Sequence, residues 1–415
     1  MPSLTSRPHN APSKLNPNKV KQARLSRGIS AAELAEKLGK TRQTINQYEI
    51  GTIEPPISIL KQLGLILGYP IEFFYKESEP NAPIGAVFFR SKKTAPRVEK
   101  DMAIANLHIT KQISSYFRQF IDFPANNILD VGYDEIEKGL NYDEIARLAS
   151  ELRQAWGLGL SPVVNLTQCM EKNGVAVHAF NLGLKKIDGF STLVDGVPFV
   201  LINTDRESNA RLRLSLAHEL AHIYLHAKVF SDAEVENNKD LIKRLEDEAW
   251  YFASEFLLPK QIFLRELYSH SIPFALGESG EAALGQGPRG IDHLVNLKAK
   301  WGISIAAMIK KCETLGVLTE SQIKYLWQQL TKRGYRIKEP LDDSPLEFPI
   351  AYRQTLELLT QHKILSHSEI LYNLSLSPVD VEKYCSLPQG FLCESKDEDM
   401  DDFVVMFPRA RKQKR

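Results

Sequence analysis

The sequence predicts a multidomain, mainly α-helical protein with an α+β core, and three observations support this fold class. The chain has 415 residues, which is too long for one ordinary hydrophobic core. Residues 16–76 contain the starts and ends of several short helices in close succession. Between residues 175 and 202, short apolar runs and a hairpin signal indicate a small sheet, and helical patterns resume after it.

The overall composition is that of a globular protein whose charges nearly balance. The formal net charge is +1, so any affinity for nucleic acid must come from a local patch. The sequence has no run of about 18 apolar residues and no signal-peptide core at its start, which predicts a cytoplasmic protein that does not enter a membrane. No Cys-x-x-Cys pair occurs, and we expect buried free thiols at Cys169, Cys312, Cys385 and Cys393.

Capping residues and glycines divide residues 16–76 into short helices, and we expect a five-helix domain. Four of the helices are delimited by clear signals. They open at Asn16-Pro17, Ser30, Thr41 and Pro55-Pro56, and they end at Gly28, Gly39, Gly51 and Gly68.

The second and third of these helices are joined by a tight turn at Gly39-Lys40, as in a helix-turn-helix whose second helix lies in the DNA major groove. Ile45 is expected to face the core. From residue 1 to residue 54, nine Lys or Arg stand against four acids, an excess that suits phosphates. The alternative is a small helical protein-binding domain with a solvated basic face. The side chains expected to face outward and contact base edges are Arg42, Gln43, Thr44, Asn46 and Gln47.

This segment resembles the XRE-type (Cro/CI) helix-turn-helix family over nearly its whole length. The resemblance implies a double-stranded DNA operator as partner, and a homodimer is expected because such proteins read paired half-sites. The residues that carry it are Ala31-Ala32-Glu33-Leu34-Ala35, Gly39, Tyr48-Glu49 with Gly51, and Leu67-Gly68.

Residues 77–105 are expected to form a linker, because Pro80, Pro83 and Gly85 are followed by the basic run Arg90-Ser91-Lys92-Lys93. Helical patterns then follow at residues 101–120, 142–156 and 163–173.

A small antiparallel sheet is expected next, with strands at residues 175–179, 190–193 and 198–202. Asp195-Gly196 is a strong hairpin signal between the last two strands. An edge strand of such a sheet can hold an extended peptide by main-chain pairing. The strand at Phe199 to Asn203 is the candidate for that role.

A helix-forming stretch after the sheet contains the pattern His-Glu-x-x-His at His218, Glu219 and His222. Residues four apart lie above one another on a helix, so the two histidines can direct nitrogens at one ion. A zinc-bound water has a pKa of roughly 7, and a neighbouring carboxylate can take its proton during attack on a carbonyl carbon. The pattern therefore predicts a zinc site for peptide-bond hydrolysis with Glu219 as the base.

A catalytic zinc needs a third protein ligand. His226 lies about 12 Å along the helix axis from His218, too far for one ion to bind all three histidines, and we expect a polar residue near the helix end. The next helix, at residues 240–258, carries Glu246 at roughly 70° and Glu248 at roughly 90° from the centre of its apolar stripe. We expect Glu246 as the ligand, with Glu248 as the alternative.

These patterns together resemble the ImmA/IrrE family of metallopeptidases over about residues 148–259. The resemblance implies a gluzincin-like fold with His218, His222 and Glu246 on the zinc ion and Glu219 as the base. The best understood members cleave a helix-turn-helix repressor, which releases genes of a mobile element or a DNA-damage response. Members often carry Gly at the position of Ala221. The matching stretches are Ala217 to His222 with Leu225-His226, Glu246-x-Glu248-Ala249 with Phe252-Ala253, Phe256 to Pro259, Trp156 to Gly159, and Asn173-Gly174-Val175.

The last third of the chain is expected to be helical, after a mobile glycine-rich loop at residues 282–290. Amphipathic helices at residues 303–315 and 319–332 are expected to pack on the catalytic domain or to contact DNA or a partner. The expected divisions are a flexible tail (1–15), the helix-turn-helix domain (16–76), the linker (77–105), the metallopeptidase domain (106–265), a helical extension (266–342), a small helical C-terminal unit (343–395) and a charged tail (396–415).

Together these features predict a cytoplasmic DNA-binding regulator with a zinc-dependent endopeptidase domain. Its expected substrate is a transcription factor, or the protein itself. The alternative is a repressor or antitoxin-like protein whose metallopeptidase fold is a sensory or dimerisation module without proteolysis.

Overall fold

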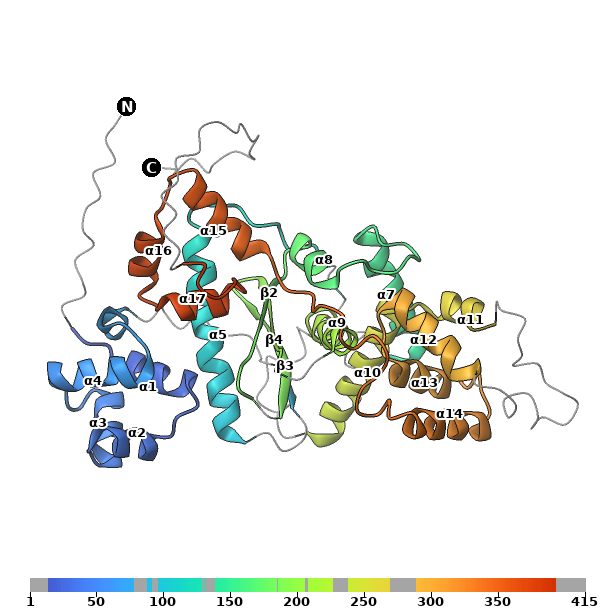
Figure 1. Ribbon diagram of the computed structural model, residues 1–415, viewed down its shortest axis with the longest axis horizontal. Coiled ribbons are helices and arrows are strands. Elements are labelled where there is room, and N and C mark those ends of the chain that lie inside the picture. The colour runs from blue at the N-terminus through green and yellow to red at the C-terminus, as the bar shows by residue number, and fades with distance from the viewer. Residues whose placement is uncertain are drawn as a thin grey trace, which may run out of the picture.

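The computed structural model describes residues 14–77, 88–91, 96–128, 131, 139–184, 186–205, 208–226, 238–268 and 289–392. In Figure 1 the N-terminal helices lie at one end of the long axis, the sheet in the middle and a group of yellow and orange helices at the other end. The expected tails, up to residue 13 and from residue 393, lie outside the described residues. The glycine-rich loop lies outside them up to residue 288.

The N-terminal module contains five helices, as predicted, although the fifth is a 3-10 helix. Asn16, Ser30 and Thr41 cap the first three helices by accepting a hydrogen bond from a backbone N–H of the first turn. Gly39 adopts a φ of 62°, which ends the second helix and turns the chain into the third. The helices are α1 (Pro17–Ser26), α2 (Ala31–Leu38), α3 (Arg42–Ile50), α4 (Ile57–Leu67) and η1 (Ile71–Tyr75).

The long helix α5 (Arg97–Phe117) stands between the N-terminal module and the sheet (Figure 1). Its buried residues, among them Ala103 and Leu107, share one hydrophobic core with the buried residues of the module. The strand β1 (Phe88–Ser91) and the first turns of α5 fall within residues 77–105, where a linker was expected. The helix begins directly after Pro96, whose backbone is extended.

The sheet has four strands in the order β1-β3-β4-β2. β3 (Ile187–Val194) and β4 (Val197–Asn203) form the predicted hairpin, with Asp195 and Gly196 at φ values of 51° and 78°, as a tight two-residue turn requires. β2 (Ala176–Phe180) pairs in parallel with β4. The prediction of an antiparallel sheet is therefore wrong for β2. The sheet is mixed because the connection from β2 to β3 crosses β4.

This strand order also excludes the predicted role of Phe199 to Asn203 as a substrate-binding edge. β4 is an interior strand, flanked by β3 and β2, and its residues from Pro198 onward are buried. The edge strands of the described sheet are β1 and β2.

The central helices form layers on the sheet. α9 (Asn209–His226) packs on β3 and β4, α10 (Lys239–Leu257) packs on α9, and α7 (Tyr142–Ala155) packs on α10. The short helix α8 (Leu166–Lys172) contacts α9 and β2. Because α9 is covered by the sheet and by helices, every residue from Ser215 to His226 is buried.

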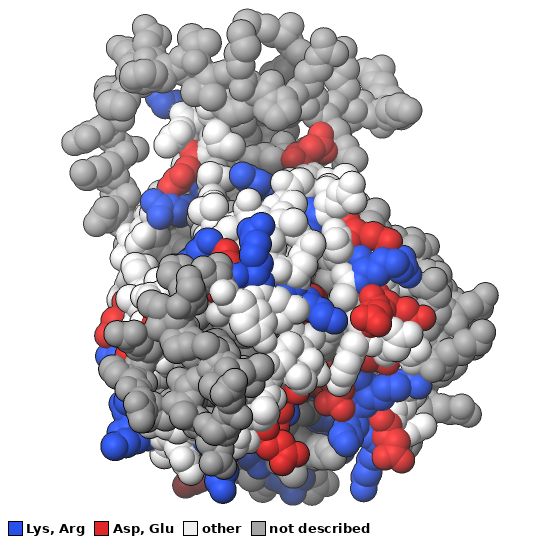
Figure 2. All heavy atoms as spheres, turned by 90° about the vertical axis from the view of Figure 1, so that its right-hand side faces the viewer, with Lys and Arg blue, Asp and Glu red and all other residues white. Residues whose placement is uncertain are grey.

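The helical extension packs on this central unit, which is one of its expected roles. Trp301, Ile309 and Leu326 belong to the same hydrophobic core as the buried residues of α9 and α10. On the face that Figure 2 shows, Lys and Arg are interspersed with Asp and Glu. Within the extension, Lys310 and Glu313 form an ion pair. The elements are α11 (Lys260–Tyr268), α12 (Arg289–Trp301), α13 (Ile305–Thr314) and α14 (Glu320–Lys332).

The C-terminal helices fold back over α5 and β2 to the N-terminal module (Figure 1). They are α15 (Ala351–Gln361), α16 (His367–Leu374) and α17 (Pro378–Tyr384). Both nitrogens of the Arg27 guanidinium fork donate to the Asp380 carboxylate at 2.7 Å. The backbone oxygen of Tyr384 lies 3.0 Å from Nδ1 of His178 on β2. The first contact joins the C-terminal unit to the N-terminal module, and the second joins it to the sheet.

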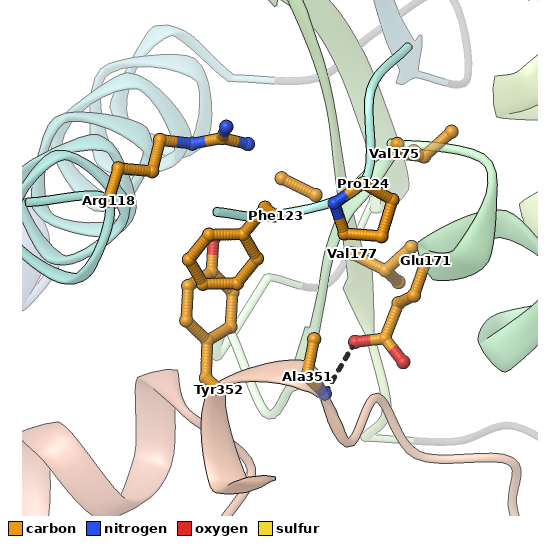
Figure 3. Close-up of a pocket in the computed structure, with 10 residues that line it drawn as sticks. Arg118, Phe123, Pro124, Glu171, Val175, Val177, Ala351 and Tyr352 are labelled. Carbon is orange, nitrogen blue, oxygen red and sulfur yellow. Dashed lines mark hydrogen bonds between the residues drawn. The ribbon is translucent and has the colours of Figure 1, made fainter. Parts of the chain in front are cut away.

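Figure 3 shows a small pocket where the start of α15 meets α8, β2 and the segment after α5. Glu171 of α8 accepts hydrogen bonds from the backbone N–H groups of Ile350 and Ala351 at 3.0 Å, and so caps α15. The ten residues that line this pocket include none of the predicted metal ligands.

Two further sequence predictions concern membrane helices and thiols. None of the helices in the described part of the chain is long and apolar enough to cross a membrane. Cys312 and Cys385 are buried and Cys169 is half-buried, all as free thiols, whereas Cys393 lies outside the described residues.

Candidate functional site

The helix α9 brings the two predicted histidine ligands together. His218 and His222 lie one turn apart, both buried between the sheet and α10. Their Nε2 atoms are 3.1 Å apart, so both rings present the same nitrogen to one point. This is the arrangement that the four-residue spacing predicts.

Glu246 of α10 completes a group of three metal-binding side chains with His218 and His222. Its carboxylate oxygens lie 3.3 Å from Nε2 of His218 and 3.6 Å from Nε2 of His222. One donor atom from each of the three residues lies within 4.8 Å of the others. Burial acts to raise the pKa of Glu246, but the two histidines outweigh it, and the pKa lies well below its usual range.

The spacing of these donor atoms fits a zinc ion. In a tetrahedral site with zinc–ligand distances of about 2.0–2.1 Å, neighbouring ligand atoms are about 3.3 Å apart. The Nε2 atoms of the two histidines are 3.1 Å apart, close to that edge length, and each has a different Glu246 oxygen nearby, Oε2 at 3.3 Å from His218 and Oε1 at 3.6 Å from His222. Two imidazoles and a carboxylate are also ligands that zinc favours, and they leave a fourth position for water or substrate.

Glu219 is fully buried beside these ligands and faces β3. The hydroxyl of Ser191 donates to its Oε2 at 2.7 Å. A Cβ atom placed on Gly189 would lie 3.6 Å from Oε1. β3 therefore runs directly alongside the candidate base, and the Ser191 hydroxyl fixes the orientation of its carboxylate.

His226 is the last residue of α9, near the helix end as expected, and it has buried partners that the sequence did not indicate. It is fully buried, and its Nδ1 lies 3.0 Å from Nδ1 of His222 while its Nε2 lies 3.2 Å from Glu248. Burial lowers the pKa of His226 to about 4, against the effect of Glu248, so the ring is neutral near pH 7.

Glu248 therefore has a role different from that of Glu246. It accepts a hydrogen bond from the backbone N–H of Leu140 at 3.1 Å and contacts His226. Glu248 contacts His226, and His226 contacts Nδ1 of His222, the nitrogen that does not face Glu246. These two residues can therefore orient the ring of His222, as outer partners do in metal sites. In the sequence, this contact is indicated by the four-residue spacing from His222 to His226, which repeats the spacing from His218 to His222.

The third helix of the N-terminal module presents the predicted DNA-contacting residues at its surface. Ile45 is fully buried, as predicted, and Glu49 is buried in an ion pair with Arg24. Of the predicted set, Arg42, Gln43 and Asn46 are exposed, and Thr44 and Gln47 are half-buried. The turn at Gly39 joins α2 to this helix in the geometry of a helix-turn-helix.

Comparison with known proteins defines the class of both regions. Residues 20–74 match a helix-turn-helix domain. Residues 170–313, which include β2 to β4, α9 and α10, match the IrrE N-terminal-like domain of the peptidase M78 class. The chain therefore carries an N-terminal helix-turn-helix domain followed by an IrrE-like domain.

A curated relative is similar to part of the chain. It is the SPbeta prophage-derived uncharacterized HTH-type transcriptional regulator YonR of Bacillus subtilis (strain 168), with 41% identity over 58 residues. The matched stretch is 14% of this chain and 54% of that protein, so the chain spans about half the length of the curated relative.

Proposed function

We propose that this protein is a DNA-binding transcriptional regulator whose IrrE-like domain is a zinc-dependent endopeptidase. One observation carries the proposal: the donor atoms of His218, His222 and Glu246 converge at zinc-ligand spacing beside the buried carboxylate of Glu219. Because the same chain contains a helix-turn-helix domain, we infer that the peptidase acts in gene regulation.

In the proposed mechanism, His218, His222 and Glu246 hold the zinc ion. When bound, zinc supplies Lewis acidity and lowers the pKa of a coordinated water. Glu219 would act as the general base, with its carboxylate held in place by the Ser191 hydroxyl, which donates to Oε2. Burial keeps bulk water from this carboxylate, and Glu248 and His226 hold the ring of His222 in position.

The proposed DNA partner is an operator read by α3. Arg42, Gln43 and Asn46 are exposed on one side of that helix, where Arg and Asn can contact base edges bidentately. A homodimer is part of this proposal, because paired half-sites require two recognition helices.

The proposed substrate is a transcription factor or repressor in the cytoplasm, cleaved in a stress or mobile-element response. The relative's description as a prophage-derived transcriptional regulator supports the mobile-element setting. A bacterial regulator that removes a repressor by one selective cut needs no general proteolytic activity.

The Glu219→Gln variant tests the peptidase proposal. It keeps all three proposed ligands and loses the base, so zinc content and DNA binding should be unchanged while cleavage falls at least about 100-fold. New protein N-termini in cells that produce either form, and transcription of the regulated genes, are the measurements. The matched control is Asp247→Asn, the same acid-to-amide change at an exposed position of α10. Full regulation by the zinc-loaded Glu219→Gln protein would contradict the peptidase proposal and favour a non-proteolytic sensory module.

A further inference from the structure

The strand β3 is the part of the sheet that lies alongside the candidate base. Ser191 of β3 bonds to the Glu219 carboxylate, and Gly189 brings the backbone of β3 close to its other oxygen. On one edge, the main-chain N–H and C=O groups of β3 pair with β4. The groups on the opposite edge, here called the outer edge, point away from β4. A peptide paired with the outer edge would run past Glu219.

This outer edge of β3 is covered by β1. The two strands are antiparallel, with Phe88 opposite Ser191, Phe89 opposite Phe190 and Arg90 opposite Gly189. The segment that pairs with β3 next to Glu219 is therefore β1, a strand of the same chain. β1 also approaches α9, the helix that carries Glu219.

We propose that the outer edge of β3 is a binding site for an extended peptide, and that β1 occupies this site as an internal competitor. The proposal rests on the proposed peptidase function. An extended segment adds to a sheet edge through main-chain hydrogen bonds, which are the same for β1 and for a substrate. A substrate of this protein must then displace β1 before its backbone can lie beside Glu219.

The geometry of β1 suits an occupant that can be displaced. It has four residues, it pairs with β3 alone, and the register shifts between Arg90 and Ser91. In the sequence, β1 lies between the helix-turn-helix domain, whose last helix ends at Tyr75, and α5. The competitor is thus part of the connection between the DNA-binding domain and the rest of the protein.

A binding experiment in full-length, zinc-loaded protein with Glu219→Gln tests this proposal without cleavage. The probe is a fluorescein-labelled peptide with the sequence of residues 84–95. Phe89→Pro removes a backbone N–H and disfavours pairing of β1, whereas Phe89→Val keeps the N–H and the strand preference. Fluorescence anisotropy should show at least about tenfold tighter binding with Phe89→Pro, and unchanged binding with Phe89→Val, because a tethered competitor acts at high effective concentration.

Equal affinity of all three proteins for the peptide would overturn the proposal. If Phe89→Pro does not fold, a variant with residues 86–93 replaced by Gly and Ser in equal number takes its place, with the same expected gain. The two proposals fail separately. Tighter binding with Phe89→Pro would support the β3 site even if the search for new protein N-termini contradicts the peptidase function, whereas equal affinity together with such cleavage would contradict the β3 site alone.

Discussion

At the residue scale, two glutamates of α10 that are two positions apart have different surroundings and should differ in their effect on zinc. Glu246 lies against His218 and His222, whereas Glu248 lies against His226. We expect Glu246→Ala to abolish stable zinc binding, because one of three protein ligands is lost. Glu248→Gln should weaken zinc binding about 10–100-fold, as loss of an outer partner does.

Zinc content after dialysis and chelator competition measure both effects, with circular dichroism to confirm folding. The helical-face argument for Glu246 is wrong if Glu246→Ala keeps its zinc while Glu248→Ala loses it. The sequence placed the two glutamates nearly symmetrically about the apolar stripe, and only the distances to the histidines distinguish them.

Arg42 is the residue of α3 best suited to read a base, because it is exposed at the first position of that helix. Arg42→Ala should weaken binding to the preferred operator by about 1–3 kcal/mol if the guanidinium contacts guanine bidentately. Duplexes enriched from a random pool on the parent protein supply the operator, and fluorescence anisotropy measures the affinity. Lys61→Ala, an exposed site on α4, is the matched control. Equal affinity of the parent for all duplexes would contradict specific readout.

At the element scale, the start of α15 depends on a buried carboxylate from another helix. Burial raises the pKa of Glu171 to about 7 from its ordinary 4.5, although the N–H groups of Ile350 and Ala351 act to lower it. Between pH 4.5 and 7 the folded chain keeps a proton that the unfolded chain releases. Stability therefore falls as the pH rises through this window, by at most about 1.4 kcal/mol per pH unit, and is constant above it.

Glu171→Gln removes this titration while its amide oxygen can still accept from the start of α15. Relative to the parent, the free energy of unfolding of the variant should increase from pH 5 to pH 7 and then stay level, as measured by urea unfolding. His178, whose pKa burial lowers to about 4, changes stability in the opposite sense, but it does so in both proteins and cancels in the difference. Glu151→Gln, at a partly exposed site of α7, is the control. A constant difference across the pH range would refute the role of Glu171.

The elements themselves were largely predictable, because their signals are local. Asn16, Ser30 and Thr41 mark helix starts through hydrogen bonds within one turn, and Asp195-Gly196 marks the hairpin through its backbone conformation. The parallel pairing of β2 with β4 was not predictable in this way. It depends on which side of β4 the strand joins, which no residue near Ala176 encodes.

At the scale of the whole molecule, no pattern in the sequence indicates that the N-terminal module shares a core with the C-terminal unit. Buried residues of both, such as Leu63 and Leu374, belong to one hydrophobic core. The pair Arg27–Asp380 joins positions that are 353 residues apart. The sequence analysis divided the chain into separate domains. The apolar face of a helix indicates that this face is buried, but it does not indicate which other part of the chain covers it.

This shared core predicts that the N-terminal module stays attached when the chain is cut behind it. A recognition site for a specific protease is placed within residues 78–87, and the protein is cleaved and passed over a size-exclusion column. The fragment with α1 to α4 should co-elute with the remainder, because α1 packs on α5 and the Arg27 guanidinium is held by Asp380 of the C-terminal unit. Arg27→Ala removes these bonds and should release the fragment at lower concentrations. Separation of the fragments of the parent protein, at concentrations where both remain folded, would show that the module is tethered by the chain alone.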